Sequence, residues 1–411
     1  MDAREQRGIQ LASTAKLTQK GNLWIVPSQS GEDPYRVELA KDTPSCTCPD
    51  HSVRAVKCKH IWAAEYTIRR ETAPDGTTTV VTTARVTKEK RMTYRQDWPA
   101  YNLAQTHEKE HVVELLHGLC EGIVQPKQLK GRPRLPLAEL VFAAALKVYG
   151  TLSARRTMCD LRDCQAKGWL TRLPCYNSIF NVFEDEALTP LLKTLIEESA
   201  APLKAIEANF TVDSSGFSSS RFDRWFDEKY GKLRSEHQWI KAHLMSGVKT
   251  NIVTSAEVTG PDSNDSPHLP PLLAATTNRF TVEELSGDKG YISAKNLEAV
   301  VNAGGIPYIP FKINTTGEGP ELWRKLYHYF LYRREEFLQH YHQRSNAETV
   351  FSMIKAKFGD SLRSRMRTAQ INEALCKVLC HNLCCLVSAI YELGIEPTFW
   401  AEAAVAQEVA G

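Results

Sequence analysis

The spacing of apolar residues changes along the chain, and each change predicts a different kind of structure. Residues 1–40 alternate short apolar and polar stretches, as at 23–27 and 35–39, which predicts two or three strands. Residues 97–207 place apolar residues three and four positions apart, which predicts an all-helical region. Strand and helix patterns then mix from residue 208 to 360. This mixture predicts an α/β layered domain with a central sheet.

The individual elements follow from the same pattern, with Pro and Gly at many of the joins. Predicted helices of the helical region are 108–119, 137–149, 153–168, 176–183 and 189–200. Predicted strands of the mixed region are 210–213, 239–246, 252–258, 282–286 and 306–311. Its predicted helices are 269–276, 293–303 and most of 320–358, and another spans 371–391.

Domain boundaries follow from shifts in composition. Residues 1–70 contain a Cys/His segment that leads into a short helix at 61–70, and residues 71–96 are Thr-rich with a charged run, typical of an exposed linker. We therefore predict five parts. They are a small Cys/His module (1–70), a linker (71–96), a helical region (97–207), the α/β domain (208–360) and a C-terminal helical tail (361–411).

Bulk composition narrows the class of protein only slightly. The 411 residues are 42% hydrophobic and 24% charged, which is ordinary for a globular protein of several units. A formal charge of +3 does not identify a nucleic-acid binder, so local basic patches must do so. No apolar run reaches the length of a membrane span, the first residues lack the apolar core of a secretory signal, and the 11 cysteines are an odd number. We therefore expect a cytoplasmic protein with reduced cysteines.

A helical stretch late in the chain carries a regular set of polar residues. Tyr341, Arg344, Glu348 and Lys355 lie at offsets of 0, 3, 7 and 14, close to whole helical turns. The predicted apolar side of this helix consists of Val350, Phe351, Met353 and Ile354. Such a helix holds a carboxylate among cations, which suits a metal and phosphate site. The alternative is a solvated helix face on which Arg344 and Glu348 form an ordinary i,i+4 pair.

Two further acids follow predicted strands. Asp213 precedes a flexible Ser-Ser-Gly segment, and Asp288 lies two residues before Gly290. Carboxylates at adjacent strand ends, with Glu348 from a covering helix, can converge on a pair of divalent cations. Taken singly, each Asp is as well explained as a turn former or a helix cap. The same is true of Asp262, Asp265 and His268, which we interpret as turn residues.

These motifs together resemble one known family. The Tyr-x2-Arg-x3-Glu-x6-Lys spacing, the sequence Thr-Val-Asp-Ser-Ser-Gly-Phe around Asp213 and the sequence Gly-Asp-Lys-Gly-Tyr at Asp288 resemble the bacterial insertion-sequence DDE transposases, over about residues 97–390. The resemblance implies a ribonuclease-H-like core in which Asp213, Asp288 and Glu348 bind two Mg²⁺ or Mn²⁺ ions. It implies that Tyr341, Arg344 and Lys355 contact DNA phosphate. The spacing of 60 residues from Asp288 to Glu348 leaves little room for a large inserted β domain.

The resemblance also implies an activity. Such an enzyme cleaves double-stranded DNA at the terminal repeats of the element and joins the freed 3′-OH to target DNA, as a homodimer assembled on DNA. Two alternatives remain. One is a metal-dependent endonuclease without strand transfer, and the other is a catalytically silent DNA-binding protein.

The N-terminal Cys/His segment predicts a separate, structural metal site. Cys46, Cys48, Cys58 and His60 form a Cys-x-Cys-x9-Cys-x-His pattern, a closed tetrahedral set suited to one structural Zn²⁺. The pattern resembles the SWIM zinc finger, and the alternative is four unlinked residues. Its basic flank suits contact with DNA or protein. Seven of the eight remaining cysteines are interpreted as core residues, with a metal site at His381 as the alternative to a core stripe for the last three: Cys120, Cys159, Cys164, Cys175, Cys376, Cys380 and Cys384.

Three basic clusters are candidate DNA contacts. Lys130, Arg132 and Arg134 surround Gly and Pro ahead of a helix, which suits a segment lying along phosphates. Arg155 and Arg156 begin a predicted helix pair (153–168 and 176–183) that resembles a helix-turn-helix. Arg363 and Arg365 follow the Tyr-Arg-Glu-Lys helix and extend a possible DNA track, or belong to a solvated loop.

Overall fold

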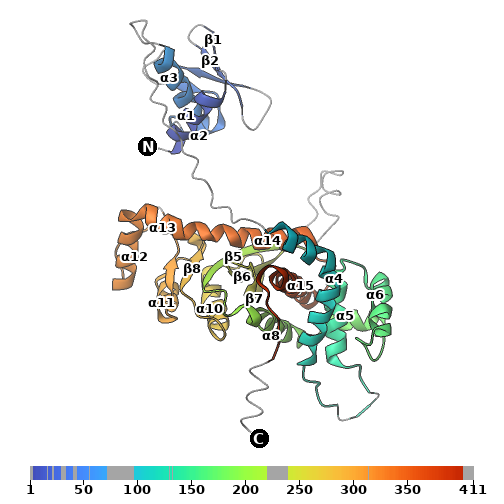
Figure 1. Ribbon diagram of the computed structural model, residues 1–411. Coiled ribbons are helices and arrows are strands. Elements are labelled where there is room, and N and C mark those ends of the chain that lie inside the picture. The colour runs from blue at the N-terminus through green and yellow to red at the C-terminus, as the bar shows by residue number, and fades with distance from the viewer. Residues whose placement is uncertain are drawn as a thin grey trace. The chain divides into compact units, whose positions relative to one another are not determined.

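The computed structural model forms two compact units, Met1–Arg95 and Gln96–Gly411 (Figure 1). It describes residues 3–15, 17–20, 23–28, 34–39, 44–54, 56–71, 97–128, 130–131, 133–219, 239–312 and 314–400. Residues 72–96 of the predicted linker, Arg132 and the last eleven residues of the tail, 401–411, lie outside the described residues. We describe each unit by itself.

The first unit packs helices against a small antiparallel sheet of order β1-β2-β3-β4. The elements are α1 (Ala3–Thr14), β1 (Thr18–Lys20), β2 (Leu23–Val26), β3 (Tyr35–Glu38), β4 (Ser45–Cys46), α2 (Pro49–Arg54) and α3 (Lys59–Glu71). Trp24, Val26 and Val37 from the sheet pack with Leu11 of α1 and Ile61 of α3. The predicted strands at 23–27 and 35–39 are confirmed, but residues 3–14 form a helix that the alternating pattern did not predict. Its buried Leu11 packs against the other elements, and this tertiary contact supports the helix.

The second unit begins with helices whose ends the local sequence determines. They are α4 (Trp98–Glu121), α5 (Leu137–Tyr149), α6 (Ala154–Ala166), α7 (Tyr176–Glu184), α8 (Leu188–Ala200) and the 3-10 turn η1 (Ala201–Leu203). The side chains of Asp97 and Ser153 accept hydrogen bonds from the first turns of α4 and α6. Helix α5 is apolar on most of its circumference because it is buried in the core. The five predicted helices are confirmed, with α4 beginning ten residues earlier than expected.

A five-stranded mixed sheet of order β7-β6-β5-β8-β9 lies at the centre of this unit (Figure 1). The strands are β5 (Asn209–Ser218), β6 (Trp239–Gly247), β7 (Val253–Thr259), β8 (Glu284–Gly287) and β9 (Ile306–Tyr308). Strands β5, β6 and β7 pair antiparallel, whereas β8 pairs parallel with β5 and β9 parallel with β8. Between the strands lie η2 (Ser266–His268), α10 (Leu269–Thr277), η3 (Lys289–Tyr291) and α11 (Ala294–Asn302). The predicted α/β layering is confirmed.

The chain then returns over the sheet as a nearly continuous helical run. It consists of α12 (Glu321–Tyr332), α13 (Arg334–Tyr341), η4 (His342–Arg344) and α14 (Ser345–Phe358), followed by α15 (Arg367–Leu393). Val350, Phe351 and Ile354 are buried as predicted, but Met353 is 41% exposed, so its assignment to the apolar side is wrong. The 3-10 turn η4 changes the helical phase, so the predicted single helix is interrupted between Tyr341 and Glu348.

Helix α15 is the central core helix of the second unit. It contacts α4, α5, α7 and α8 as well as strand β7, so the helical region and the sheet share one hydrophobic core. Its length and composition would allow it to cross a membrane, but 78% of its most apolar window is buried inside the protein. A long buried core helix resembles a membrane-spanning helix in length and composition because both consist mainly of apolar residues.

Candidate functional sites

The four residues of the predicted zinc site converge in the first unit. Cys46 comes from β4, Cys48 from the following loop, Cys58 from the residue before α3 and His60 from the first turn of α3. Their ligand atoms lie within 4.8 Å of one another. All four are buried, and the three cysteines form no disulfide. His60 Nδ1 lies 3.8 Å from Cys46 Sγ and 3.9 Å from Cys58 Sγ. Three thiols and one imidazole at these distances fit a structural zinc ion.

Asp213 and Asp288 meet on neighbouring strands of the second unit. Register pairs Val212 of β5 with Gly287 of β8, so the two acids that follow these residues lie at the same level of the sheet. Asp288 directly follows its strand, as expected. Asp213 does not end its strand, because β5 continues to Ser218 and pairs with β6 throughout. The predicted flexible segment after Asp213 is therefore wrong, and the antiparallel partner strand is the reason.

Arg344 links the first acid to the third. Its Nη2 lies 3.9 Å from Asp213 Oδ1, and its Nη1 lies 3.1 Å from Glu348 Oε1. Asp213 is only 16% exposed, whereas Glu348 in the first turn of α14 is 61% exposed. The structure thus brings the three predicted acids and Arg344 together from β5, the end of β8 and the η4–α14 junction. The i,i+4 pair of Arg344 and Glu348 also exists, but Arg344 reaches beyond it to the sheet.

The other two residues of the Tyr-Arg-Glu-Lys set also face this region. Lys355 Nζ donates a hydrogen bond of 2.6 Å to Ser215 Oγ, two residues after Asp213. Burial lowers the pKa of Lys355 below its usual value. Tyr341 is partly buried, and burial together with the nearby Asp288 and Glu348 raises the pKa of its hydroxyl, although Arg344 opposes this. Tyr341 therefore lies within the electrostatic surroundings of the acids. Lys355 reaches the strand that carries Asp213, but the charge that acts on its pKa is Asp360.

The electrostatics of the acids favour a bound cation. Burial raises the pKa of the Asp213 carboxyl, and repulsion from Asp288 and Glu348 adds to this, while a Ser214 backbone hydrogen bond and Arg344 oppose it. A divalent cation between these carboxylates would remove both penalties, so the donor set fits hard ions such as Mg²⁺. Among the described residues the three carboxylates do not form a group as close as the Cys/His set, since Arg344 lies between Asp213 and Glu348.

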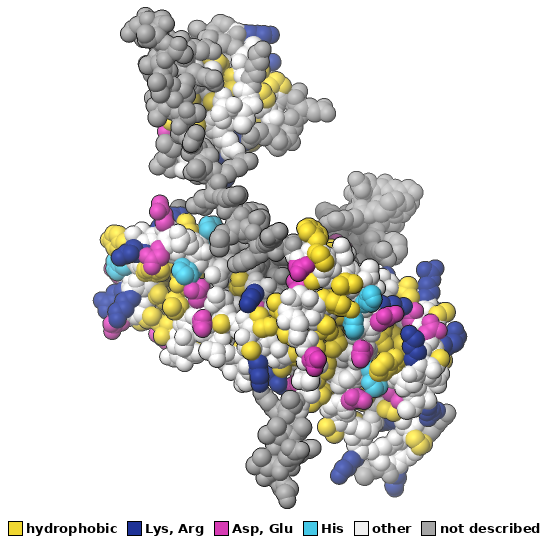
Figure 2. Space-filling view, viewed as in Figure 1, with side chains coloured by type: hydrophobic (Ala, Val, Ile, Leu, Met, Phe, Trp, Pro, Cys, Tyr) yellow, Lys and Arg dark blue, Asp and Glu magenta, His cyan; other side chains and the backbone are white. Residues whose placement is uncertain are grey.

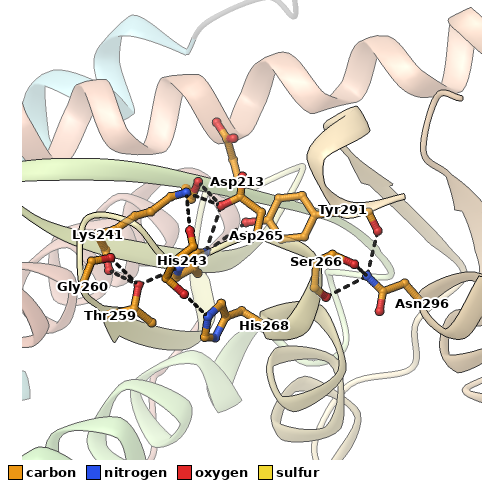
Figure 3. Close-up of polar contacts among 12 residues, drawn as sticks. Asp213, Lys241, His243, Thr259, Gly260, Asp265, Ser266, His268, Tyr291 and Asn296 are labelled. Carbon is orange, nitrogen blue, oxygen red and sulfur yellow. Dashed lines mark hydrogen bonds and ion pairs between the residues drawn. The ribbon is translucent and has the colours of Figure 1, made fainter. Parts of the chain in front are cut away.

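A polar network beside these acids was missed by the sequence interpretation (Figure 3). Asp265 Oδ1 accepts a hydrogen bond of 2.8 Å from Ser214 Oγ and lies 2.7 Å from Lys241 Nζ and 3.4 Å from His243 Nδ1. Asp265 begins a turn, as predicted, because its carbonyl accepts a hydrogen bond from the His268 amide, but its side chain also joins this network. No local pattern could have revealed this, because its partners come from β5 and β6. His268 also belongs to the network, stacking on His243 at 4.3 Å, whereas Asp262 is exposed as a turn residue would be.

The predicted basic contacts are exposed where the structure describes them. Lys130 and Arg134 lie in the loop before α5, which Gln128 braces by a hydrogen bond to the Lys130 carbonyl and another from the Arg134 amide. Arg155 and Arg156 begin α6, and Arg155 lies over the Tyr176 ring at the start of α7. Figure 2 shows Lys and Arg in small groups on the face in view rather than in one continuous patch.

The loop that carries Arg363 and Arg365 is held firmly by α15. Glu373 accepts hydrogen bonds from the Arg363 and Ser364 amides. Lys377 Nζ donates to the carbonyls of Gly359 and Ser361 at 2.8 Å each. Two exposed arginines therefore extend from a rigid backbone that begins directly after α14.

Most of the remaining cysteines are core residues. Cys376 and Cys380 on α15 are fully buried, and His381 Nε2 pairs with the Asn251 carbonyl rather than joining a close metal-ligand set among the described residues. Cys120 and Cys164 are also buried, but Cys159 and Cys175 are exposed, so the core interpretation of these two is wrong. They lie on the outer side of α6 and in the loop before α7.

Comparisons with known proteins give two family matches, and each covers the residues of one candidate site. Residues 209–383 match the transposase DDE domain, and residues 35–69 match the SWIM zinc finger. No curated protein matches the chain. Among solved structures, the piggyBac transposase in a synaptic complex with hairpin DNA is similar at 11% identity and a TM-score of 0.34, covering 73% of this chain and 76% of that one.

Proposed function

We propose that this chain, which carries a transposase DDE domain and a SWIM zinc finger, is an insertion-sequence transposase. It cleaves DNA at the element's ends and joins the freed 3′-OH to target DNA. The observation that carries this proposal is the meeting of Asp213, Asp288 and Glu348 beside Arg344 within the matched domain. The antiparallel β5-β6-β7 strands followed by parallel β8 and β9 support a ribonuclease-H-like core.

Each residue has a role that follows from its position. Asp213, Asp288 and Glu348 would hold two Mg²⁺ or Mn²⁺ ions, which when bound activate the attacking oxygen and stabilise the leaving one. Arg344 offers a planar fork and Lys355 a point charge for phosphate oxygens near the cleaved bond. Tyr341 borders the same phosphate. The residues position DNA and neutralise its charge, without a covalent protein intermediate.

DNA outside the site would be held by the basic groups. The braced loop with Arg363 and Arg365 continues from α14 and supplies positive charge at low entropic cost, since its backbone is already ordered. Lys130, Arg132, Arg134, Arg155 and Arg156 are the further proposed phosphate contacts. Two ends must be held together, so a homodimer on DNA in the bacterial cytoplasm is part of the proposal.

The test is DNA cleavage and strand transfer with the element's own ends and Mg²⁺ or Mn²⁺. Wild type is compared with Asp213→Ala, Asp288→Ala and Glu348→Ala, and Asp262→Ala serves as an exposed control. We expect each of the three acid variants to lose both steps while it still binds DNA ends. Cleavage without joining would identify an endonuclease instead. End binding without any cleavage by wild type would identify a silent DNA-binding protein.

A further inference from the structure

Asp265 contacts both chain segments that carry the paired acids of the sheet. Its Oδ1 accepts a hydrogen bond from Ser214, the residue after Asp213. Its Oδ2 packs against Gly290, two residues after Asp288, so closely that a Cβ at Gly290 would lie 3.0 Å from it. One carboxylate therefore contacts the residue directly after Asp213 and the second residue after Asp288, although the two acids lie 75 residues apart in the sequence.

Asp265 contacts β5 from the face of the sheet that is opposite to α14. Successive side chains of a strand point to opposite faces of the sheet. Lys355 of α14 donates a hydrogen bond to Ser215, so Ser215 faces α14. Ser214 therefore faces the other side of the sheet, where Asp265 lies beside His243 and Lys241 of β6 (Figure 3). Asp265 thus supports the strand without facing Glu348.

A second link joins the Asp265 loop to the Asp288 turn. The Asn296 side chain donates hydrogen bonds to the carbonyls of Ser266 (2.8 Å) and Tyr291 (2.7 Å). The Tyr291 amide in turn donates to the Asp288 carbonyl at 2.9 Å. Residues 265–266 and the turn at 288–291 therefore form one braced unit (Figure 3).

The charge of Asp265 is already matched. Lys241 Nζ lies 2.7 Å from Asp265 Oδ1. The neighbouring His243, whose Nδ1 lies 3.4 Å from the same oxygen, is fully buried. Burial alone would raise the pKa of Asp265, but the hydrogen bonds from Lys241 and Ser214 hold it below its usual value. A carboxylate that is ionised and paired in this way supports its neighbours and does not compete for a cation.

We propose that Asp265 is a positioning residue that sets the separation of Asp213 and Asp288 for divalent-cation binding. This inference rests on the proposed function, since it assigns a support to the same site. Groups that orient metal ligands in this way typically contribute about 10- to 100-fold in metal affinity or activity.

The first experiment measures Mn²⁺ binding by calorimetry on the full-length, zinc-loaded protein. We expect Asp265→Asn to weaken Mn²⁺ binding about tenfold, and to raise the Mg²⁺ concentration for half-maximal cleavage by a similar factor. The cleavage rate at saturating metal and the affinity for DNA ends should stay near wild type. Asp262→Asn, the same change at an exposed position of the same loop, should alter none of these quantities.

Two results would overturn the inference. Unchanged Mn²⁺ affinity in Asp265→Asn would show that the contact is not needed for positioning. Loss of the ion as complete as in Asp213→Ala would make Asp265 a ligand instead. If Asp265→Asn fails to fold, as judged by its melting temperature, Ser214→Ala provides the same test, because it removes the hydroxyl that donates to Asp265 and keeps the Lys241 pair. Ser214→Ala must then weaken Mn²⁺ binding in the same direction.

The same Mn²⁺ measurements test the proposed function independently of the role of Asp265. If Asp213→Ala binds Mn²⁺ at this site as wild type does, the three-carboxylate assignment fails whatever Asp265 does. If Asp213→Ala loses the ion and Asp265→Asn keeps it, only the positioning role fails.

Discussion

The carboxylate of Asp213 is held in surroundings that disfavour its charge. Burial is the main cause of its raised pKa. The neighbouring Asp288 and Glu348 add repulsion, while the Ser214 backbone hydrogen bond and Arg344 oppose the rise. Such an arrangement costs stability in the absence of a cation, and this cost is typical of functional sites. Under the proposed function, a bound divalent cation would offset this cost.

This cost predicts that Asp213→Asn stabilises the protein when no Mg²⁺ or Mn²⁺ is added. A raised pKa means that the folded state binds the proton more tightly than the unfolded state. The destabilisation caused by the Asp213 charge is therefore absent at acid pH, where the carboxyl is protonated in both the folded and the unfolded state. It is complete at pH values above the pKa of the folded state. We expect a higher melting temperature for Asp213→Asn at pH 7 and a difference that shrinks toward pH 4.

The measurement is thermal unfolding of the zinc-loaded protein at several pH values, with Asp262→Asn as the exposed control. A lower melting temperature of Asp213→Asn at pH 7 would mean that its pairing with Arg344 outweighs burial and repulsion.

Helix α15 organises the elements around the site through buried charges. Glu373 is nearly fully buried and pairs with Lys147 of α5 at 3.9 Å while it binds the amides of Arg363 and Ser364. Burial by itself raises the pKa of Glu373, but Lys147 and these hydrogen bonds together lower it below its usual value. The same helix therefore anchors the core and the basic loop.

We predict that Glu373→Gln lowers the free energy of unfolding at pH 7 by about 3 kcal/mol, because Lys147 is left as a buried charge without its partner. Because the pKa of Glu373 is lower in the folded state, its contribution to stability is present at pH values above the pKa of the unfolded state. That contribution is lost as the pH falls through the pKa of the folded state. The difference from wild type should therefore shrink in acid. Urea unfolding measures it, with exposed Glu396→Gln as the control, and equal stability of the two variants at pH 7 would contradict the prediction.

The whole chain divides into two units with separate cores. The first unit has a small core, and its Cys46, Cys48, Cys58 and His60 cluster lies at the junction of β4 and α3. Small domains of this kind commonly depend on bound zinc for folding. The second unit contains a large continuous core and needs no such support.

Removal of zinc should therefore unfold residues 3–71 and leave the second unit folded. We expect a chelator, or His60→Ala, to remove one thermal transition and to leave the transition of the second unit within a few degrees of its original temperature. Differential scanning calorimetry with and without added zinc measures this, and His51→Ala is the control within the same unit. A parallel loss of both transitions would show that the two units do not fold independently.

Local sequence was sufficient for those features that depend on near neighbours. The zinc ligands lie within 15 residues, Glu348 and Lys355 share one helix, α14, and α5 carries its own apolar pattern and end signals. Asp213 and Asp288 were found because short sequence contexts mark them. Helix α1 was missed because residues 1–40 were interpreted together as alternating strands.

The tertiary structure decided what depends on register and on distant partners. The pairing of Val212 with Gly287 places Asp213 beside Asp288, and the same sheet brings Asp265 to Ser214 and Lys241. A turn residue and a positioning residue have the same local sequence, so only the folded neighbours distinguish them. The sequence by itself therefore determined which residue types are available for the chemistry. The long-range packing of strands and of α15 decided where those residues lie and which others support them.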